Sequence, residues 1–220
     1  MRKVILDFDG VLFDSAVEAH AVCESIPKNW NNLSLKTFSF PEFMKFRKHI
    51  NTSTDFLPYY VGNTVIDQEL KKQFKATFYA QRKIISLTKN YVKENFPPYK
   101  FMYDIRELIT ENPDIFYVLS TRDEDSIKAT LKSYVQFKPE NIFGQAVYSA
   151  AGSKVQALQE RGLALSDCLY VDDLCSHLYP FEKYATKLIQ ADWGYGELDE
   201  SYSADMDSAL QQVMGWLNGA

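Results

Sequence analysis

The sequence predicts an α/β fold in which a parallel sheet forms the core and a helical segment is inserted after the first strand. Short runs rich in β-branched residues end at polar side chains, and after Pro97 and Pro98 they alternate with segments of helical spacing. Such alternation is typical of parallel βαβ units. Between residues 15 and 97, strand-like alternation is scarce and aromatic residues at helical spacing are common, which indicates a helical insert.

The amino-terminal segment predicts a buried strand that is followed by a turn and a helix. The strand is expected over residues 3–8, because this apolar run ends in acidic residues and Gly10. Ser15 and Glu18 have the spacing of a capping box, so a helix is expected to begin at about Ser15. Within the insert, Pro41 suits the first turn of another helix.

The segment after Pro98 predicts further strands and helices in alternation. The expected strands cover residues 115–119, 142–148, 168–171 and 187–189. The expected helices cover residues 101–111, 154–161, 175–183 and 204–217, and one more is expected to be opened by Thr121 and Glu124.

Polar side chains at the expected strand ends are the first candidates for a functional site, because an open parallel sheet binds its ligand beyond the carboxyl ends of its strands. Asp7 and Asp9 follow the first strand, and their spacing in extended chain points both carboxylates roughly the same way. A divalent cation would relieve the resulting repulsion. Asp172 and Asp173 follow a later strand and can complete an oxygen-rich site of the kind that Mg²⁺ prefers.

Two more residues of this pattern suit a phosphoryl group. Ser120 follows the second expected strand and offers a hydroxyl donor. Lys154 stands at the start of a helix, just after Gly152 and Ser153, and offers a positive charge. A hydroxyl donor, a cation and a Mg²⁺ site together complement the charge of a phosphoryl group.

The segment Asp7–Ser15, with the sequence DFDGVLFDS, resembles the first motif of the haloacid dehalogenase superfamily of phosphohydrolases. The remaining motifs follow in the same order. Ser120 is similar to the hydroxyl of the second motif, Lys154 to the lysine of the third, and the pair Asp172-Asp173 to the acidic fourth. The segment Trp193–Gly196, after the last expected strand, also looks like a run found in part of that superfamily.

The resemblance implies a Rossmann-like catalytic core formed by residues 1–14 and 98–220, and a helical cap domain formed by residues 15–97. It also implies hydrolysis of a small-molecule phosphate monoester, with Asp7 as the nucleophile that forms an aspartyl phosphate. Asp9 would protonate the departing oxygen and then deprotonate the water that hydrolyses the intermediate.

The resemblance further implies a set of ligands for Mg²⁺. The cation would be held by the Asp7 carboxylate, the backbone carbonyl of Asp9 and Asp173, with Asp172 close by. The sequence departs from the family pattern in two places: His177 stands four residues after Asp173, where the family often has Asp or Asn, and Lys154 is not followed by the proline found in many relatives. The outer part of the metal site is therefore expected to differ from that of the relatives.

The substrate is expected to contact a separate group of residues. Ser120 and Lys154 would hold the non-bridging oxygens of the phosphoryl group. Thr121 and Arg122 lie beside Ser120 and are further candidates for substrate binding, although Ser120 and Thr121 also suit the cap of the following helix. Specificity is expected to reside in the insert, whose aromatic residues follow packing patterns and form no recognition motif.

Composition excludes several other classes of protein. The formal net charge of -5 argues against a nucleic-acid-binding surface, which needs clustered Lys and Arg. Cys23, Cys168 and Cys175 are odd in number and lack metal-site spacing, so they are expected to be packing residues. No apolar stretch approaches the roughly 20 residues that span a bilayer, so a soluble, cytoplasmic protein is expected. No pattern in the sequence sets an oligomeric state.

Four alternative functions use part of the same pattern. A phosphosugar mutase of the beta-phosphoglucomutase type needs the same residues and differs in the acceptor of the phosphoryl group, so the sequence leaves it open. A dehalogenase needs neither a metal nor a leaving-group acid, so Asp9 and the pair Asp172-Asp173 argue against it. A phospho-acceptor signalling domain carries its acid after a middle strand and has no use for a large insert. Intact Asp7, Asp9 and Lys154 argue against a non-catalytic binding protein.

Overall fold

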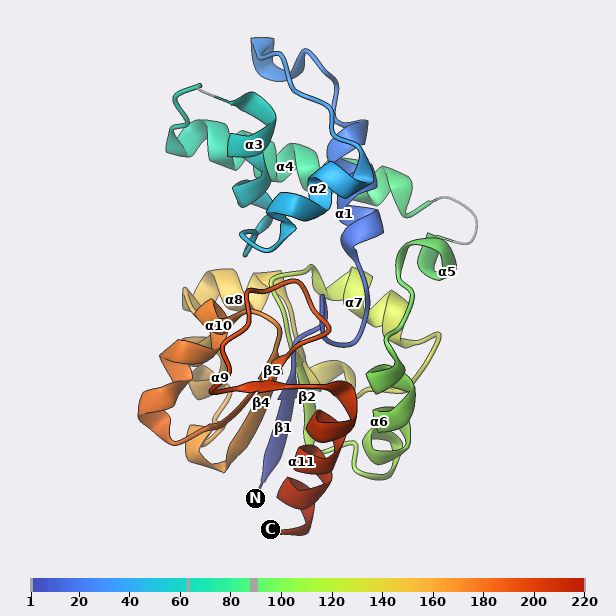
Figure 1. The fold of residues 1–220 in the computed structure, drawn as a ribbon, viewed down its shortest axis with the longest axis vertical. Helices are drawn as coiled ribbons and strands as arrows, with labels where there is room; N and C mark the ends of the chain where they lie inside the picture. Colours follow the sequence, from blue (N-terminus) through green and yellow to red (C-terminus); the bar gives the residue numbers. More distant parts are fainter. Residues whose placement is uncertain (1, 63, 88–90, 220) are drawn as a thin grey trace. The chain divides into compact units, whose positions relative to one another are not determined.

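The computed structural model describes residues 2–62, 64–87 and 91–219 (Figure 1). The chain divides into two compact units, which we describe separately. The core unit consists of Met1–Asp14 and Pro98–Ala220, and the inserted unit consists of Ser15–Pro97.

The core unit is built on a six-stranded sheet with the strand order β3-β2-β1-β4-β5-β6, in which all neighbouring strands pair in parallel. The strands are β1 (Lys3–Leu6), β2 (Phe116–Leu119), β3 (Ile142–Phe143), β4 (Cys168–Asp172), β5 (Lys187–Ala191) and β6 (Ser203–Ala204). The central strands are almost entirely buried, because helices cover both faces of a parallel sheet. The predicted parallel α/β core is confirmed.

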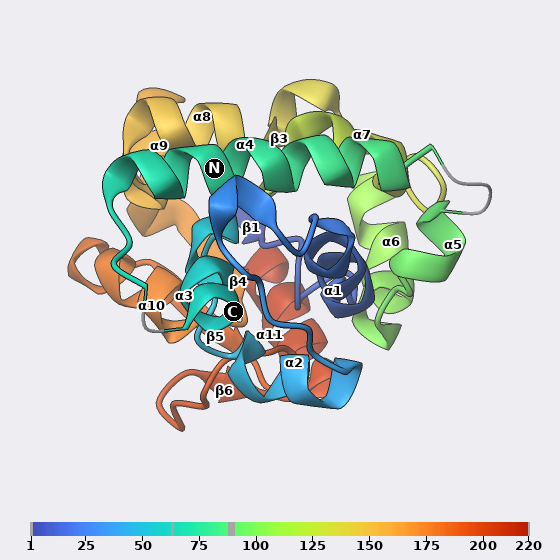
Figure 2. The same ribbon diagram turned by 90° about the horizontal axis from the view of Figure 1, so that it is seen from above.

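Helices lie on both faces of this sheet. They are α6 (Lys100–Glu111), α7 (Glu124–Leu131), α8 (Gln145–Ala151), α9 (Lys154–Glu160), α10 (Cys175–Leu178) and α11 (Met206–Asn218). Figures 1 and 2 show α6 and α11 side by side on one face, with α8, α9 and α10 on the other. Right-handed crossovers produce this division, because the chain moves away from β1 in one direction first and in the opposite direction later.

Several predicted boundaries in the core unit are wrong, and in two cases residues belong to a different kind of element than predicted. The strand expected over residues 142–148 ends at Phe143, and α8 begins at Gln145 with Gly144 as its N-cap. Periodicity does not distinguish a buried strand from a helix in so short an apolar run. The sequence analysis also placed Ala204 at the start of the last helix, whereas it belongs to the short strand β6 and α11 begins at Met206.

The inserted unit is helical and has its own aromatic core. Its helices are α1 (Ala16–Ser25), α2 (Phe40–Arg47), α3 (Leu57–Val61), α4 (Gln68–Ile85) and α5 (Tyr91–Asn95). Pro41 lies in the first turn of α2, as predicted. The aromatic side chains of this unit pack on one another, with Phe43, Phe74 and Phe78 completely or almost completely buried. The expectation that these rings serve packing is confirmed.

A buried ion pair replaces the predicted capping box at the start of α1. Ser15 is the N-cap residue, but its side chain makes no capping hydrogen bond. The Glu18 carboxylate is fully buried and accepts hydrogen bonds from Nε and Nη2 of Arg82, at 2.6 and 3.1 Å, and from the Tyr91 hydroxyl at 3.0 Å. The partners of Glu18 are therefore distant in sequence, and a local pattern could not predict them.

We expect Arg82→Met to destabilise the inserted unit by about 3–5 kcal/mol, because it leaves a buried carboxylate without its counter-charge. Denaturant unfolding followed by circular dichroism would measure the change. The double variant Glu18→Gln with Arg82→Met is the control, since it removes both charges and should recover most of the loss. An equal loss in the single and the double variant would show that packing, and not charge, explains the effect.

Cys23, Cys168 and Cys175 are free, and the first two are buried. Burial raises the pKa of the Cys168 thiol to about 11 and that of Cys23 further, so both thiols stay protonated at neutral pH. Across the described parts of the chain, every helix is too short or too polar to cross a membrane.

Candidate active site

The candidate site lies at the carboxyl ends of β1 and β4. Strands β2 and β3 are added on one side of β1, and β4, β5 and β6 are added on the other, so the strand order reverses at this point. β1 pairs with β2 on one side and with β4 on the other, so the carboxyl ends of β1 and β4 lie next to each other. The backbone N–H of Asp7 donates to the Val171 carbonyl at 2.9 Å, which brings Asp7 beside the last residue of β4, Asp172. Open parallel sheets form their ligand crevice at such a switch point.

Three carboxylates converge at this point. Asp7, Asp172 and Asp173 each contribute an oxygen atom, and these atoms lie within 4.8 Å of one another. All three side chains are buried. Buried like charges so close together require a counter-charge, which makes this cluster the candidate metal centre among the described residues.

Lys154 supplies one counter-charge. It is the first residue of α9, a helix whose N-cap, Ser153, accepts a hydrogen bond from the backbone N–H of Gln156. The buried ammonium group donates to Oδ1 of Asp7 at 2.8 Å and to Oδ2 of Asp172 at 2.6 Å. Burial lowers the pKa of Lys154, but the two carboxylates outweigh burial and hold that pKa above its ordinary value. Lys154 is therefore a permanent cation between two acids.

One lysine does not balance the charge of three carboxylates, and the excess negative charge affects the pKa of Asp7. Burial raises the pKa of Asp7 well above its usual range, Asp172 and Asp173 raise it further, and Lys154 opposes them. Burial also raises the pKa of Asp172, but Lys154 and His177 outweigh burial and hold it below its usual range. A divalent cation beside Asp7 would supply the missing positive charge, so the donor set fits Mg²⁺.

Two further side chains surround the Lys154–Asp172 pair. The Tyr170 hydroxyl is buried, lies 2.7 Å from Nζ of Lys154 and donates to Asp172. Nδ1 of His177 lies 3.1 Å from both carboxylate oxygens of Asp172 and 3.1 Å from Nζ of Lys154. His177 therefore contacts both members of the Lys154–Asp172 pair. Tyr170 was not among the predicted site residues, although it lies two residues before Asp172 and therefore on the same face of β4.

Asp9 is paired with Arg122. Nε of Arg122 lies 3.0 and 3.1 Å from the two carboxylate oxygens of Asp9, and Nη2 lies 2.9 Å from Oδ1. The Arg122 side chain is 1% exposed and that of Asp9 is 19% exposed, so the guanidinium group lies beneath a carboxylate that reaches solvent. Arg122 is predicted from the sequence to contact the substrate, whereas in the structure its guanidinium group contacts the Asp9 carboxylate.

Ser120 lies at the carboxyl end of β2, in the same loop as Arg122. Its backbone N–H donates to the Phe143 carbonyl at 2.9 Å, and its hydroxyl accepts from the backbone N–H of Arg122 at 3.3 Å. The predicted opening of α7 by Thr121 is wrong, because Asp123 is the N-cap and accepts from the backbone N–H of Ser126 at 2.8 Å. Since Asp123 caps the helix, neither Ser120 nor Thr121 serves that purpose.

The loop after β5 reaches the same strand ends. In the segment Trp193–Gly196, the backbone N–H of Tyr195 donates to Oδ2 of Asp173 at 2.8 Å. The Tyr195 hydroxyl donates to Oδ1 of Asp14 at 2.7 Å, and Nε1 of Trp193 donates to the Val11 carbonyl at 3.1 Å. The loop therefore connects Asp173 to the segment that follows Asp7.

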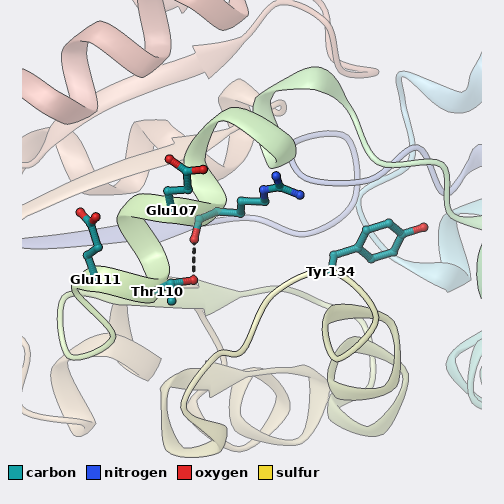
Figure 3. Close-up of a pocket in the computed structure, with 5 residues that line it drawn as sticks. Glu107, Thr110, Glu111 and Tyr134 are labelled. Carbon is teal, nitrogen blue, oxygen red and sulfur yellow. Dashed lines mark hydrogen bonds between the residues drawn. The ribbon is translucent and has the colours of Figure 1, made fainter.

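The core unit also has a hollow of about 340 Å³ that lies apart from the carboxylate cluster. It is lined by Arg106, Glu107, Thr110 and Glu111 of α6 and by Tyr134 (Figure 3). The Thr110 hydroxyl donates to the carbonyl of Arg106 one turn earlier, at 2.8 Å, so this bond stays within the helix. None of its lining residues belongs to the carboxylate cluster, and we assign no site to it.

Comparison with known proteins identifies the fold. No family model matches this sequence, and no curated protein matches it. The structure is similar to that of a predicted phosphatase from Clostridium acetobutylicum, with a TM-score of 0.71, 16% identity and coverage of 97% of this chain and 98% of the other. It is also similar to a haloacid dehalogenase-like family hydrolase from Streptococcus pneumoniae, with a TM-score of 0.69, 15% identity and coverage of 99% and 98%.

A third similar structure is that of a predicted phosphoglycolate phosphatase from Haemophilus somnus, with a TM-score of 0.65, 14% identity and coverage of 97% and 98%. At these identities the similarity establishes the fold. The predicted resemblance and fold class are therefore confirmed at the level of architecture.

Proposed function

We propose that this chain, which has the haloacid dehalogenase-like fold, is a Mg²⁺-dependent phosphatase that acts on a small-molecule phosphate monoester through an aspartyl-phosphate intermediate. The observation that most supports this proposal is the buried Lys154 ammonium group between Asp7 and Asp172, in a cluster that still has excess negative charge. A nucleophilic acid, a fixed cation and a cation-binding set are the parts that phosphoryl transfer needs.

In the first step, an oxygen of Asp7 attacks phosphorus, and the bond between phosphorus and the leaving oxygen breaks. Asp9 gives its proton to the leaving oxygen. In the second step, Asp9 takes a proton from water, and this water attacks phosphorus. The acyl-phosphate bond breaks, inorganic phosphate leaves, and Asp7 and Asp9 return to their starting forms.

The remaining residues orient the reacting groups. Ser120 and Lys154 bind the non-bridging oxygens, with Thr121 as a further substrate contact. Arg122 holds the Asp9 carboxylate in one orientation, because three of its contacts to Asp9 are 3.1 Å or shorter. It therefore acts on the substrate through Asp9.

Mg²⁺ would be held by the carboxylates of Asp7 and Asp173 and the backbone carbonyl of Asp9, with Asp172 nearby, and would neutralise charge on the transferring group. The raised pKa of Asp7 supports this assignment, because a cation is what would return this acid to the ionised form that a nucleophile requires.

The inserted unit, residues 15–97, is proposed to act as a cap domain that excludes water and selects the leaving group. Its separate aromatic core supports this role, since the unit is compact and packs around a core of its own. Phosphoglycolate is a reasonable first substrate to test, because similar structures are described as predicted phosphoglycolate phosphatases.

Removal of the metal tests the proposal. The full chain would be assayed for phosphate release from an aryl phosphate and a panel of metabolite phosphates that includes phosphoglycolate, with Mg²⁺ and with a chelator. We expect release that the chelator abolishes and that added Mg²⁺ restores, because Asp7 needs the cation to be ionised.

Equal release with and without the chelator would contradict the assigned mechanism. Conversion of a sugar phosphate to its isomer without free phosphate would reassign the protein as a mutase. If no compound in the panel reacts, the catalytic proposal fails and a binding role becomes the next hypothesis.

A further inference from the structure

Gln190 is a fully buried polar side chain at the carboxyl side of β5. It pairs in register with Asp172 of β4, so it lies beside the strand end that carries the acidic pair. A buried amide is costly unless its donors and acceptors are bonded, and the partners of Gln190 therefore show what it serves.

The Gln190 amide joins two segments of backbone. Its Nε2 donates to the Asp173 carbonyl at 3.0 Å and to the Glu197 carbonyl at 2.8 Å. Its Oε1 accepts from the backbone N–H of Asp199 at 2.7 Å. Two carbonyls and one N–H surround the group, so this orientation is the one that satisfies it. Gln190 thus ties the loop over residues 192–199 to the backbone of Asp173.

This loop approaches Asp173 as closely as glycine permits. A Cβ atom on Gly194 would lie 2.2 Å from Cβ of Asp173, and one on Gly196 would lie 2.1 Å from its carbonyl oxygen. Such distances are far inside van der Waals contact, so no other residue fits without displacing the loop. Between these glycines, the backbone N–H of Tyr195 donates to Oδ2 of Asp173 at 2.8 Å.

We infer that Gln190 is a positioning residue that prepares Asp173 for cation binding. It holds the loop in place, the loop presents the Tyr195 N–H, and that N–H fixes one orientation of the Asp173 carboxylate. A ligand that is already ordered loses less conformational freedom when the cation binds, which raises the affinity. The inference rests on the proposed Mg²⁺ site and adds a residue that contacts neither the metal nor the substrate.

The test compares Gln190→Leu with a matched variant, Asn141→Leu. Asn141 is also a buried amide, and its Nδ2 donates to the carbonyls of Pro113 and Phe116 at 3.0 and 3.1 Å. It lies at the opposite end of the sheet, directly before β3. Both variants therefore remove a side chain that bridges two carbonyls, but only one of these bridges includes Asp173.

Mg²⁺ affinity would be measured by titration calorimetry on the full chain without substrate, and the melting temperature would be measured in chelator. We expect Gln190→Leu to weaken Mg²⁺ binding about 10–100-fold, as for other groups that orient metal ligands. We expect Asn141→Leu to lower the melting temperature and to leave the Kd for Mg²⁺ unchanged. If Gln190→Leu does not fold, Gln190→Met keeps the length of the side chain and takes its place.

The outcomes separate this inference from the proposed function. Wild-type protein that binds no Mg²⁺ would overturn both. Tight Mg²⁺ binding by the wild type and by the Gln190 variant alike would overturn the inference alone. An equal loss of affinity in the Gln190 and Asn141 variants would also overturn it, because general loosening of the fold would then explain the effect.

Discussion

Asp7→Asn should abolish phosphate release and leave the fold intact. The substitution keeps the shape of the side chain, and the amide oxygen can still accept from the Lys154 ammonium, which lies 2.8 Å from Oδ1 of Asp7. An amide does not attack phosphorus, so no acyl phosphate forms, and we expect kcat to fall on the order of 10⁵-fold or more. Initial-rate and single-turnover assays with Mg²⁺ and an aryl phosphate would measure the loss.

Asp167→Asn is the matched control for this variant. Asp167 ends the 3₁₀ segment Leu165–Asp167, directly before β4, so it lies at the opposite end of the strand from Asp172. The Asp167→Asn substitution removes the same charge at the amino end of β4, away from the candidate site, and we expect kcat to stay unchanged. An Asp7→Asn variant that hydrolyses substrate as fast as wild type would show that Asp7 is not the nucleophile.

Stability should respond to Asp7→Asn in the opposite sense to activity. Burial and the neighbours Asp172 and Asp173 raise the pKa of Asp7, so a charge at this position is unfavourable in the metal-free protein. A neutral amide relieves that cost, and the melting temperature in chelator should stay equal or rise. Residues that serve chemistry commonly reduce stability in this way.

The strand-end residues were predictable because two independent rules agree on them. Asp7 and Asp172 follow short apolar runs in a βα pattern, and parallel sheets gather such ends at one edge. The order of the motifs pointed to the same residues and to Lys154. The structure brings these three together through contacts of 2.8 and 2.6 Å.

The partners of these residues were not predictable, because they depend on tertiary packing. Tyr170 lies in a buried strand, where a tyrosine ordinarily packs its ring, and only the position of α9 brings Lys154 to its hydroxyl. In the same way, the sequence placed Asp9 and Arg122 at two strand ends but did not indicate that they pair. Each of these side chains bonds to the partner that the fold brings within reach, and the number of residues between the two partners does not decide the pairing.

Local signals failed where a distant group competed with them. Glu18 has the spacing of a capping residue, but it bonds to Arg82, 64 positions later in the chain. Glu124 was expected to take part in the cap of α7, whereas its carboxylate accepts from the backbone N–H of Gly144 at 3.2 Å. Leaving the buried Glu18 carboxylate without its ionic partner would cost about 3–5 kcal/mol, which exceeds the roughly 1 kcal/mol that a local cap contributes.

Lys154→Met should reduce both activity and stability, because the lysine is proposed as a substrate ligand and is also the counter-charge of two buried carboxylates. The loss of one fixed donor to the transferring group is expected to lower kcat by about 10²–10³-fold. The same change leaves Asp7 and Asp172 buried without their shared cation, at a cost of about 3–5 kcal/mol in the free energy of unfolding. Rate assays and denaturant unfolding would measure the two effects.

The response to Mg²⁺ distinguishes this role from simple packing. A cation that binds the folded protein stabilises it in proportion to its affinity and concentration, and it would also restore part of the lost positive charge. Lys100→Met is the control, because Lys100 also contacts two carboxylates, those of Asp104 and Asp207, but is 62% exposed. Ion pairs that are exposed to solvent contribute little to stability, so the loss of Lys100 should change little. If Mg²⁺ raises the melting temperature of Lys154→Met no more than that of wild type, the lysine does not act as the counter-charge of the acidic cluster.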